Sequence, residues 1–368
     1  MARNAKAFSY QKGKDVFLLA RFILSIAYLV FFILSHLAQD LGDFLHEGSL
    51  NIFFIRFLYA FVFLSAYYIV SLPLEGAESF YYEKKFGLLR QNLAAWMVDY
   101  VKSYILSVLL FVVLVEVIYF FLARSELWWL EAWSFWVVLM FILTKLAPYV
   151  LIPLFYPLVP WEEGELKREL LALASQAGVR LKDIYKVIFS QKTTKLNAFV
   201  AGWGKGRYLA LADSLCQELT PEEIKSVFAH ELGHIKYGHA WKIFLASAAV
   251  SFCVFFLTAY AFRYSCLHLA LTPSHITTLP LLVLNGAFFF IISLPLRNAL
   301  LRYWESEADN YSMKLYPEAQ KFISALEKLG KRNLVTFSIP QWKKVLFATH
   351  PPLAERIRKI YRYVASQN

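Results

Sequence analysis

The residues best suited to chemistry are two histidines, His230 and His234, with Glu231 directly after the first of them. In a helix, side chains at positions i and i+4 lie on one face, so the two imidazoles converge on one point. Two imidazoles at this spacing suit a tetrahedral zinc ion, and the intervening glutamate can activate a water molecule. The pattern predicts a zinc-dependent hydrolytic site; the alternative is a polar helix with two solvated histidines.

A catalytic zinc ion usually has three protein ligands and one open position, so a third ligand must lie elsewhere in the chain. The metzincin pattern would require glycine at position 237 and histidine at position 240. The sequence has Tyr237 and Ala240 there, which excludes that class. His239 stands at the wrong distance for that ligand, and we interpret it as a helix-end residue; the alternative is that it supports a metal ligand.

Carboxylates in a later segment are the remaining candidates for the third ligand. Arg302, Glu305 and Asp309 share one helix face because they are spaced at i, i+3 and i+7. Glu305 could bind the metal, while Asp309 could hold a ligand imidazole by its other ring nitrogen. Spacing alone does not choose Glu305 over Glu307, and a solvated charged helix is the alternative for the whole segment.

Secondary-structure signals predict how this motif is positioned. Thr220, with Pro221 after it and Glu223 three residues later, forms a capping box that starts the helix carrying the two histidines. Three short runs rich in Val, Ile, Phe and Tyr precede it and predict a small antiparallel meander. These runs are Ile184–Ser190, Asn197–Trp203 and Arg207–Ala212. Further helices are expected over residues 163–177, 299–315, 316–331 and 352–366.

Composition places these elements in a membrane protein. Of 368 residues, 58% are hydrophobic and 18% are charged, whereas a soluble domain has about 45–50% and 25%. This bias excludes disorder, and three cysteines without a Cys-x-x-Cys pair argue against a disulfide scaffold. Six apolar runs are long enough, or nearly so, to cross a bilayer. They cover about residues 16–38, 52–73, 103–123, 127–147, 241–262 and 278–298.

Segments that are rich in Lys and Arg alternate along the chain with segments that are poor in them. Residues 1–15, 74–102, 148–240 and the segment after 299 are rich, and the loops between them are poor. Six spans with both termini in the cytoplasm satisfy the positive-inside rule at every loop. The net charge of +11 is therefore interpreted as topology rather than nucleic-acid binding. We expect Arg56 to snorkel, and Glu116 to be either functional or a helix-packing residue.

Motifs spread over most of the chain resemble the type I CAAX prenyl endopeptidases, which are integral-membrane zinc proteases. Their peptidase domain is shared with the bacterial heat-shock membrane metalloproteases. The residues that carry the resemblance follow in family order. They are Leu72-Pro73, Glu83-Lys-Lys-Phe86-Gly87, Trp96-x-x-Asp99-x-x-Lys102, the proline-rich segment 148–160, Asn197-Ala198-Phe199, His230–His234, Glu305-x-x-Ala308-Asp309, and His350-Pro351-Pro352 with Arg356.

The resemblance implies a role for each matching residue. One Zn²⁺ per chain would be bound by His230, His234 and Glu305, which settles the choice against Glu307. Glu231 would be the general base, and Asp309 would support a ligand. The remaining implied residues contact the substrate: Asn197, Ala198 and Phe199 in a strand that pairs with it, and His350 and Arg356 as hydrogen-bond donors to it or to the oxyanion. Without the resemblance, Asn197 is a turn residue and His350 lies in a loop before a helix.

The expected fold is mainly α: a polytopic helical membrane protein of about six transmembrane helices with a small zincin-type peptidase domain that carries a short antiparallel β-meander. Residues 1–157 would form an N-terminal membrane domain with four transmembrane helices. Residues 158–368 would form the zinc peptidase domain, interrupted by a transmembrane hairpin at about 241–298. Eukaryotic members of the family have seven spans, one more than is counted here.

The expected function is that of an integral-membrane, gluzincin-like zinc metalloendopeptidase, prenyl-protease-like, that hydrolyses peptide bonds near the cytoplasmic membrane face. Its partners would be a peptide or membrane-protein substrate and the lipid bilayer, with no nucleic acid. Two alternatives remain. One is a membrane-protein quality-control protease of the heat-shock type, and the other is a non-enzymatic receptor or transporter with a structural zinc site.

Overall fold

The computed structural model describes residues 2–48, 50–202 and 204–366. Six helices within these ranges are long and apolar enough to cross a membrane, which confirms the predicted number. They are α1 (Ala2–Leu34), α3 (Ile52–Glu75, continued by the π-helix η1, Gly76–Tyr82, and by α4, Glu83–Lys85), α5 (Leu93–Leu122), α6 (Trp128–Leu146, continued by η2, Ala147–Leu151, and α7, Ile152–Phe155), α11 (His239–His268) and α12 (Leu279–Leu315).

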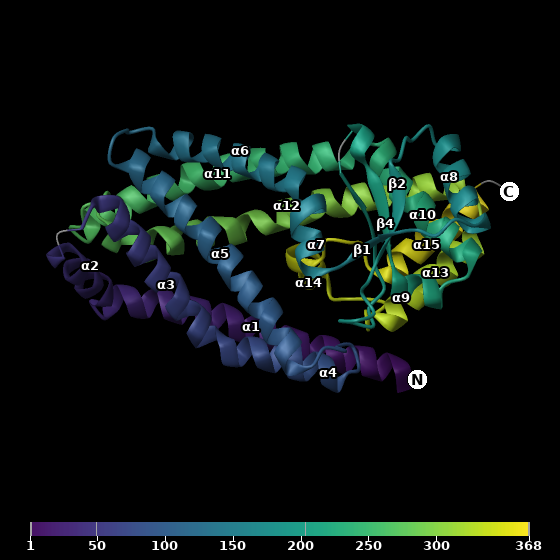
Figure 1. The fold of residues 1–368 in the computed structure, drawn as a ribbon, viewed down its shortest axis with the longest axis horizontal. Helices are drawn as coiled ribbons and strands as arrows, with labels where there is room; N and C mark the ends of the chain where they lie inside the picture. Colours follow the sequence, from purple (N-terminus) through teal and green to yellow (C-terminus); the bar gives the residue numbers. More distant parts are fainter. Residues whose placement is uncertain (1, 49, 203, 367–368) are drawn as a thin grey trace.

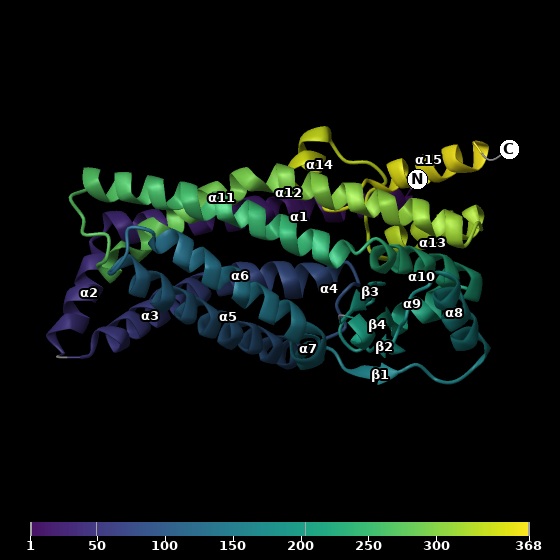
Figure 2. The same cartoon turned by 90° about the horizontal axis from the view of Figure 1, so that it is seen from above.

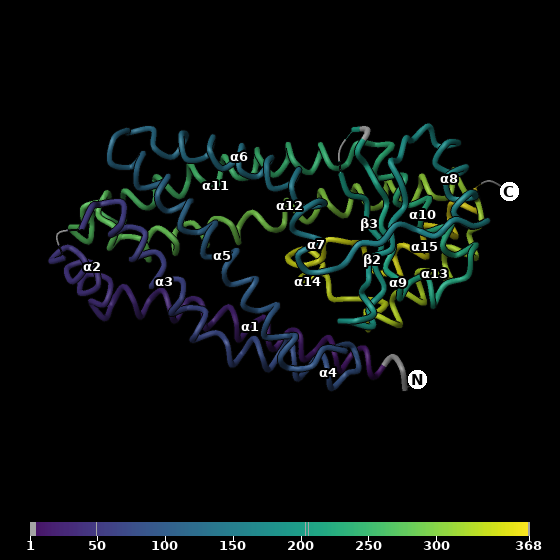
Figure 3. Tube along the Cα trace, in the orientation of Figure 1, coloured from purple at the N-terminus to yellow at the C-terminus, as the bar shows by residue number. Residues whose placement is uncertain are grey.

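The long helices run roughly along the longest axis of the molecule, and a small sheet lies at one end of them (Figures 1 and 2). Helix α1 begins at the end that carries the sheet, and α15 (Leu353–Ala365) lies at the same end (Figure 1). The short helix α2 (Leu37–Glu47) lies at the opposite end, as the tube in Figure 3 shows. An even number of spans explains why both described ends of the chain lie at the sheet end of the bundle.

Large side chains fill the bundle away from the sheet. Tyr59, Tyr119 and Phe262 are almost completely buried there, and the hydroxyl groups of Tyr119 and Thr278 lie 2.8 Å apart. The prediction that Arg56 snorkels is wrong, because this residue is only 6% exposed. Its guanidinium carbon lies 6.0 Å from the centre of the Tyr119 ring, so it packs against this side chain inside the bundle.

The sheet has four strands, in the order β1 (Leu158–Pro160), β2 (Asp183–Val187), β4 (Tyr208–Ala212) and β3 (Ala198–Ala201). The predicted antiparallel meander is therefore wrong: β2 and β4 pair in parallel, and β1 was not predicted. The tight connection at Gly204–Gly206 does make β3 and β4 antiparallel. The predicted run from Asn197 to Trp203 ends on Trp203, outside the described residues.

The burial of β4 explains the topology. All five of its residues are buried, so this strand needs covered faces and a neighbour on each side. It enters the sheet between β2 and β3, and the connection 188–197 crosses over to leave β3 at the edge. A continuous apolar run such as Tyr208–Ala212 is typical of a central parallel strand, and this signal was present in the sequence.

Helices pack around the sheet and form the second core of the molecule. The predicted helices are present as α8 (Glu165–Gln176), α10 (Pro221–Lys236), α13 (Ala319–Arg332) and α15. The predicted helix 299–315 is the second half of α12 and continues without a break from the sixth span. Two short helices, α9 (Asp213–Glu218) and α14 (Gln341–Phe347), were not predicted. Fully buried leucines at this core include Leu170, Leu211 and Leu232.

Candidate active site

Helix α10 presents the histidine motif because its start and its buried face are both fixed. The predicted capping box is present: the Thr220 amide donates to Glu223 Oε2 at 2.8 Å, and the Glu223 amide donates to Thr220 Oγ1 at 3.4 Å. Phe228 and Leu232 are fully buried in the core around the sheet. With this face held against the core, His230 and His234 lie one turn apart on an adjacent face and point toward α12.

His230, His234 and Glu305 form a triangle of potential ligand atoms. The two Nε2 atoms lie 3.2 Å apart, and they lie 3.4 and 3.5 Å from the two carboxylate oxygens of Glu305. Zn–N and Zn–O bonds of about 2.0–2.2 Å at tetrahedral angles place ligand atoms about 3.3 Å apart. The spacing and the donor chemistry therefore fit one zinc ion.

A glycine in the motif allows α12 to come close enough to complete this triangle. A Cβ atom added at Gly233 would lie 3.0 Å from the Cα atom and 3.2 Å from the carbonyl oxygen of Ala308. These are backbone atoms, so a larger residue would push the two helices apart. Glu305, one turn before Ala308 on α12, would then move away from the histidines.

Asp309 and Arg356 support His230 from behind. Asp309 Oδ1 lies 2.9 Å from His230 Nδ1, so a proton on Nδ1 leaves Nε2 free to bind a metal. Arg356 donates to the two oxygens of Asp309 at 2.9 and 2.6 Å. Burial disfavours the charged imidazole of His230, but the hydrogen bonds to Asp309 and Glu305 outweigh it and raise its pKa to about 9. A metal ion that binds at Nε2 would have to displace the proton that this nitrogen carries in the charged imidazole.

Replacing Asp309 by Asn is expected to weaken metal binding about 10–100-fold, the usual cost of losing a carboxylate that orients a ligand histidine. The measurement is the metal dissociation constant, obtained by competition with a chelator. Because the change also leaves buried Arg356 without its partner, thermal unfolding must show that the variant is folded. An unchanged metal affinity in the folded variant would contradict this role.

His234 is supported by a second pair of residues, His239 and Glu307. Its Nδ1 lies 2.9 Å from Nδ1 of His239, and His239 Nε2 lies 3.3 Å from Glu307 Oε2. His239 is the first residue of α11 and is 1% exposed, so it is a helix-end residue as interpreted, and its contact with His234 agrees with the alternative of a supporting role. The signal was Gly238, whose φ of 65° lets the chain turn back toward His234.

The carboxyl group of Glu231 lies next to the triangle and between two clefts. One cleft, of about 540 Å³, also contains Asn197, His350 and Arg356 in its wall. The other, of about 480 Å³, is mainly apolar and lies toward the ends of α6 and α11. Burial raises the pKa of Glu231 to about 7, although the charge of His230 opposes the shift. This carboxyl can therefore take and release a proton near neutral pH.

The other predicted site residues line the larger cleft. Asn197 and the strand β3 that follows it form the edge of the sheet, and β3 has β4 on its other side. His350 Nε2 lies 3.4 Å from Glu305 Oε1, and the side chain of His350 is 62% exposed. Nine of the ten predicted site residues line this cleft, and the tenth, Asp309, contacts two of them, His230 and Arg356.

Comparison with known proteins identifies the family. Residues 160–364 match the family model of peptidase family M48. The chain belongs to peptidase family M48. Residues 2–157 match a second model, described as the CAAX prenyl protease N-terminal domain with five membrane helices. Together the two matches make this M48 protein a multi-pass membrane metalloprotease of the CAAX prenyl protease type.

Individual relatives agree with the family assignment. CAAX prenyl protease 1 of Saccharomyces cerevisiae is 28% identical over 96% of this chain and 84% of its own length. An uncharacterized metalloprotease of Bacillus subtilis, YhfN, is 28% identical over 79% of this chain and 69% of its own. The crystal structure of S. mikatae Ste24p has the same fold, with a TM-score of 0.87 over 98% of this chain and 89% of that one at 22% identity.

The N-terminal half of this M48 protein differs in one respect from the description of its family model. The model is described with five membrane helices, whereas four of the six candidate spans among the described residues fall within 2–157. The additional helix of this half, α2, has 11 residues and is about 16 Å long, about half of what a bilayer core requires. It lies at the end of the bundle farthest from the sheet (Figure 1).

Proposed function

We propose that this metalloprotease is a gluzincin-like zinc endopeptidase, with one zinc ion held by His230, His234 and Glu305 and with Glu231 as its general base. The observation that carries the proposal is the triangle of ligand atoms 3.2–3.5 Å apart, with Glu231 beside it. Two clefts that meet at Glu231 leave room for a peptide on both sides of the scissile bond.

The substrate would bind as an added strand on the free edge of β3. Asn197, Ala198 and Phe199 line the larger cleft, while Val200 to Gly202 line the apolar one. A peptide along this edge would therefore cross Glu231 as it passes from one cleft to the other. Main-chain hydrogen bonds would supply most of the affinity, and the clefts would supply side-chain preference.

Glu231 would perform the proton transfers of hydrolysis. A zinc ion bound to the triangle would polarise the scissile carbonyl and make water more acidic. Glu231 would accept the proton of the attacking water and deliver it to the leaving amine, and a pKa of about 7 suits both steps. Asp309 would keep His230 in the tautomer that the metal requires.

His350 is the better placed of the two proposed oxyanion donors. It is exposed in the cleft, and its Nε2 lies 3.4 Å from a Glu305 oxygen, so it stands at the edge of the proposed metal site. Arg356 lines the same cleft, but its Nε and one Nη are bonded to Asp309. We propose that Arg356 acts mainly by holding Asp309, and that only its second Nη can reach the substrate.

The orientation we propose places the sheet and the active site in the cytoplasm, with residues 1–157 and 158–368 as the membrane and peptidase domains. Both described ends of the chain lie at the sheet end of the bundle (Figure 1). The segments at that end, 1–15, 74–102, 148–240 and 299 onward, are the ones rich in Lys and Arg. This agreement between the fold and the charge distribution supports the positive-inside orientation.

The substrate class we propose follows the printed names of the relatives, which are CAAX prenyl proteases in several eukaryotes. Quality control of membrane proteins is the alternative, and paired peptides with and without an isoprenyl cysteine would separate the two. A structural zinc site in a non-enzymatic protein is disfavoured, because such sites are usually closed by four protein ligands and this one has three.

Removal of the metal is the direct test of the proposed chemistry. The purified chain in liposomes is expected to cleave a fluorogenic peptide, to lose this activity after treatment with a chelator, and to regain it with one equivalent of Zn²⁺. Metal content and the rate of cleavage are measured on the same samples. Hydrolysis that survives complete removal of the metal would overturn the proposal.

A further inference from the structure

Two motifs of the membrane domain have no part in the proposed chemistry. They are Glu83-Lys-Lys-Phe86-Gly87 and Trp96-x-x-Asp99-x-x-Lys102. In the fold, both motifs approach one peptidase-domain segment, residues 190–197, which connects β2 to β3 and which we call the lead segment. Because the lead segment runs directly into the edge strand at the active site, whatever fixes it also fixes the start of that strand.

Backbone hydrogen bonds join the lead segment to the chain that follows the first motif. Leu89 and Thr193 form an isolated antiparallel bridge. The Thr194 amide donates to Leu88 O at 3.0 Å, and the Arg90 amide donates to Lys192 O at 2.9 Å. The lead segment therefore pairs as a short strand with the membrane domain, over 100 residues earlier in the sequence.

Two ion pairs reinforce this pairing. Lys195 Nζ lies 2.9 Å from Glu83 Oε2, and Lys192 Nζ lies 2.5 Å from Asp99 Oδ2. The side chains of Glu83 and Asp99 are only 10% and 20% exposed. Partial burial makes these pairs stronger and more orienting than surface pairs.

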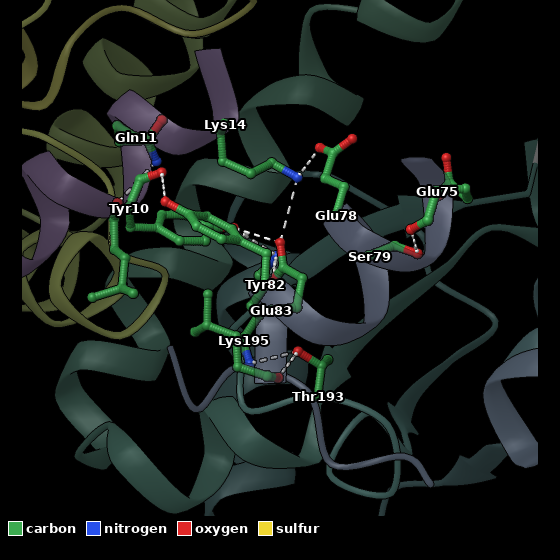
Figure 4. Close-up of polar contacts among 12 residues, drawn as sticks. Tyr10, Gln11, Lys14, Glu75, Glu78, Ser79, Tyr82, Glu83, Thr193 and Lys195 are labelled. Atoms are coloured by element: carbon green, nitrogen blue, oxygen red, sulfur yellow. Dashed lines mark hydrogen bonds and ion pairs between the residues drawn. The ribbon is translucent and has the colours of Figure 1, made fainter. Parts of the chain in front are cut away.

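Glu83 is itself held in place from the opposite side by α1. The Tyr10 hydroxyl donates to Glu83 Oε1 at 2.6 Å, and Lys14 Nζ lies 3.5 Å from the same oxygen. Figure 4 shows Tyr10, Lys14 and Lys195 turned toward Glu83 from α1 and from the lead segment. Glu83 thus joins the first transmembrane helix to a residue two positions before Asn197.

The peptidase domain holds the end of the lead segment as well. The Leu196 amide donates to Asn333 Oδ1 at 2.8 Å, and Asn333 Nδ2 donates back to Leu196 O at 2.9 Å. Ser214 Oγ donates to the carbonyl of Lys195 at 2.7 Å. The lead segment is therefore held both by the membrane domain and by the peptidase domain. Because it runs directly into β3, both sets of contacts fix the position of the strand edge that is left for the substrate.

We propose that Glu83 and Asp99 of the membrane domain are positioning residues for the proposed reaction, acting through Lys195 and Lys192 to hold β3 where the substrate pairs with it. The inference rests on the proposed function for the use of β3 by substrate. Without these ion pairs, β3 would have to be ordered each time a peptide binds, so affinity would fall. The metal ligands, on α10 and α12, make no contact with these ion pairs.

The test is replacement of Lys195 by Gln, with Lys195→Arg as the conservative variant that keeps the charge. We expect KM for a peptide to rise about tenfold in Lys195→Gln and to stay near the wild-type value in Lys195→Arg, with kcat and metal content unchanged in both. Combining Lys195→Gln with Glu83→Gln should add little to the single change, because both remove the same pair. Lys192→Gln should raise KM in the same way.

Lys343→Gln is the matched control. It also removes a lysine of the peptidase domain that pairs with the membrane domain, in this case with Asp15 at 2.5 Å, but it does not touch the lead segment. An equal rise of KM in Lys343→Gln, or no rise in Lys195→Gln and Lys192→Gln, would overturn the inference. Thermal unfolding checks that each variant is folded.

Hydrogen exchange separates this inference from the proposed function. Amides of residues 198–201 should exchange faster in Lys195→Gln than in the wild type or in Lys343→Gln, a result that requires no activity. Unchanged exchange in this strand would overturn the inference even if the protein is a protease. A wild-type protein without hydrolytic activity would overturn the proposed function and leave the exchange comparison to decide the positioning role.

Discussion

Replacing Glu231 by Gln is expected to lower kcat by about 10²–10⁴-fold while the metal stays bound. Gln has the same shape as Glu but can neither accept a proton from water nor pass one to the leaving amine. Glu231 is not part of the ligand triangle formed by His230, His234 and Glu305, so the metal affinity should hardly change. The measurements are single-turnover cleavage of a peptide and the metal content of the same preparation.

Glu222→Gln is the matched control, because Glu222 is a glutamate in the first turn of the same helix and does not line either cleft. It should cleave at the wild-type rate. The mechanism fails if Glu231→Gln retains its activity with full metal content, or if both glutamine variants lose activity equally. Since the inactive variant would still bind peptide, it should also trap natural substrates in native membranes.

The ligand set shows how far sequence reasoning reaches into the site. His230, Glu231 and His234 follow from helical spacing alone, because four residues make one turn of a helix wherever it lies. The choice of Glu305 over Glu307 did not follow from spacing, since it depends on the rotation of α12 against α10. The close approach of α10 and α12 at Gly233 and Ala308 brings Glu305 near the histidines, and the sequence offers no direct sign of it.

Contacts between residues on different helices were the part of the site that could not be worked out from the sequence. His239 belongs to a different helix from His234 and meets it only because the chain reverses at Gly238. Likewise, the role of Arg356 depends on where α15 packs. The resemblance suggested that Arg356 donates to the substrate. In the structure, its Nε and one Nη donate to the two carboxylate oxygens of Asp309.

The fold was predictable where the signal is local and not where it depends on strand order. The six spans and the capped helix α10 were correct, because length, hydropathy and capping chemistry are properties of a single segment. The meander was wrong because strand order is decided by the whole domain: the apolar run of β4 indicated a central strand, but it did not indicate that β2 would be its parallel neighbour. The burial of Arg56 depends likewise on neighbouring helices.

Replacing Glu305 by Gln is expected to weaken metal binding by more than about 100-fold, beyond the range seen when only a supporting residue is lost. Burial alone would raise the pKa of Glu305, but the hydrogen bond and charge of His230 hold it at about 2, so the carboxylate is ionised at neutral pH. Gln removes this negative charge. A divalent metal ion would then have only the two neutral imidazoles as strong ligands, so it would bind more weakly. Hydrolysis should be lost together with the metal.

Glu307→Gln is the matched control, because it makes the same substitution two residues further along the same helix. Glu307 reaches the metal site only through His239 and then His234, so its loss should weaken metal binding no more than about tenfold. Chelator competition on both variants, with thermal unfolding as the check on folding, measures the difference. Equal affinities in the two variants would contradict the assignment of Glu305 as a ligand, and a larger loss in Glu307→Gln would reverse it.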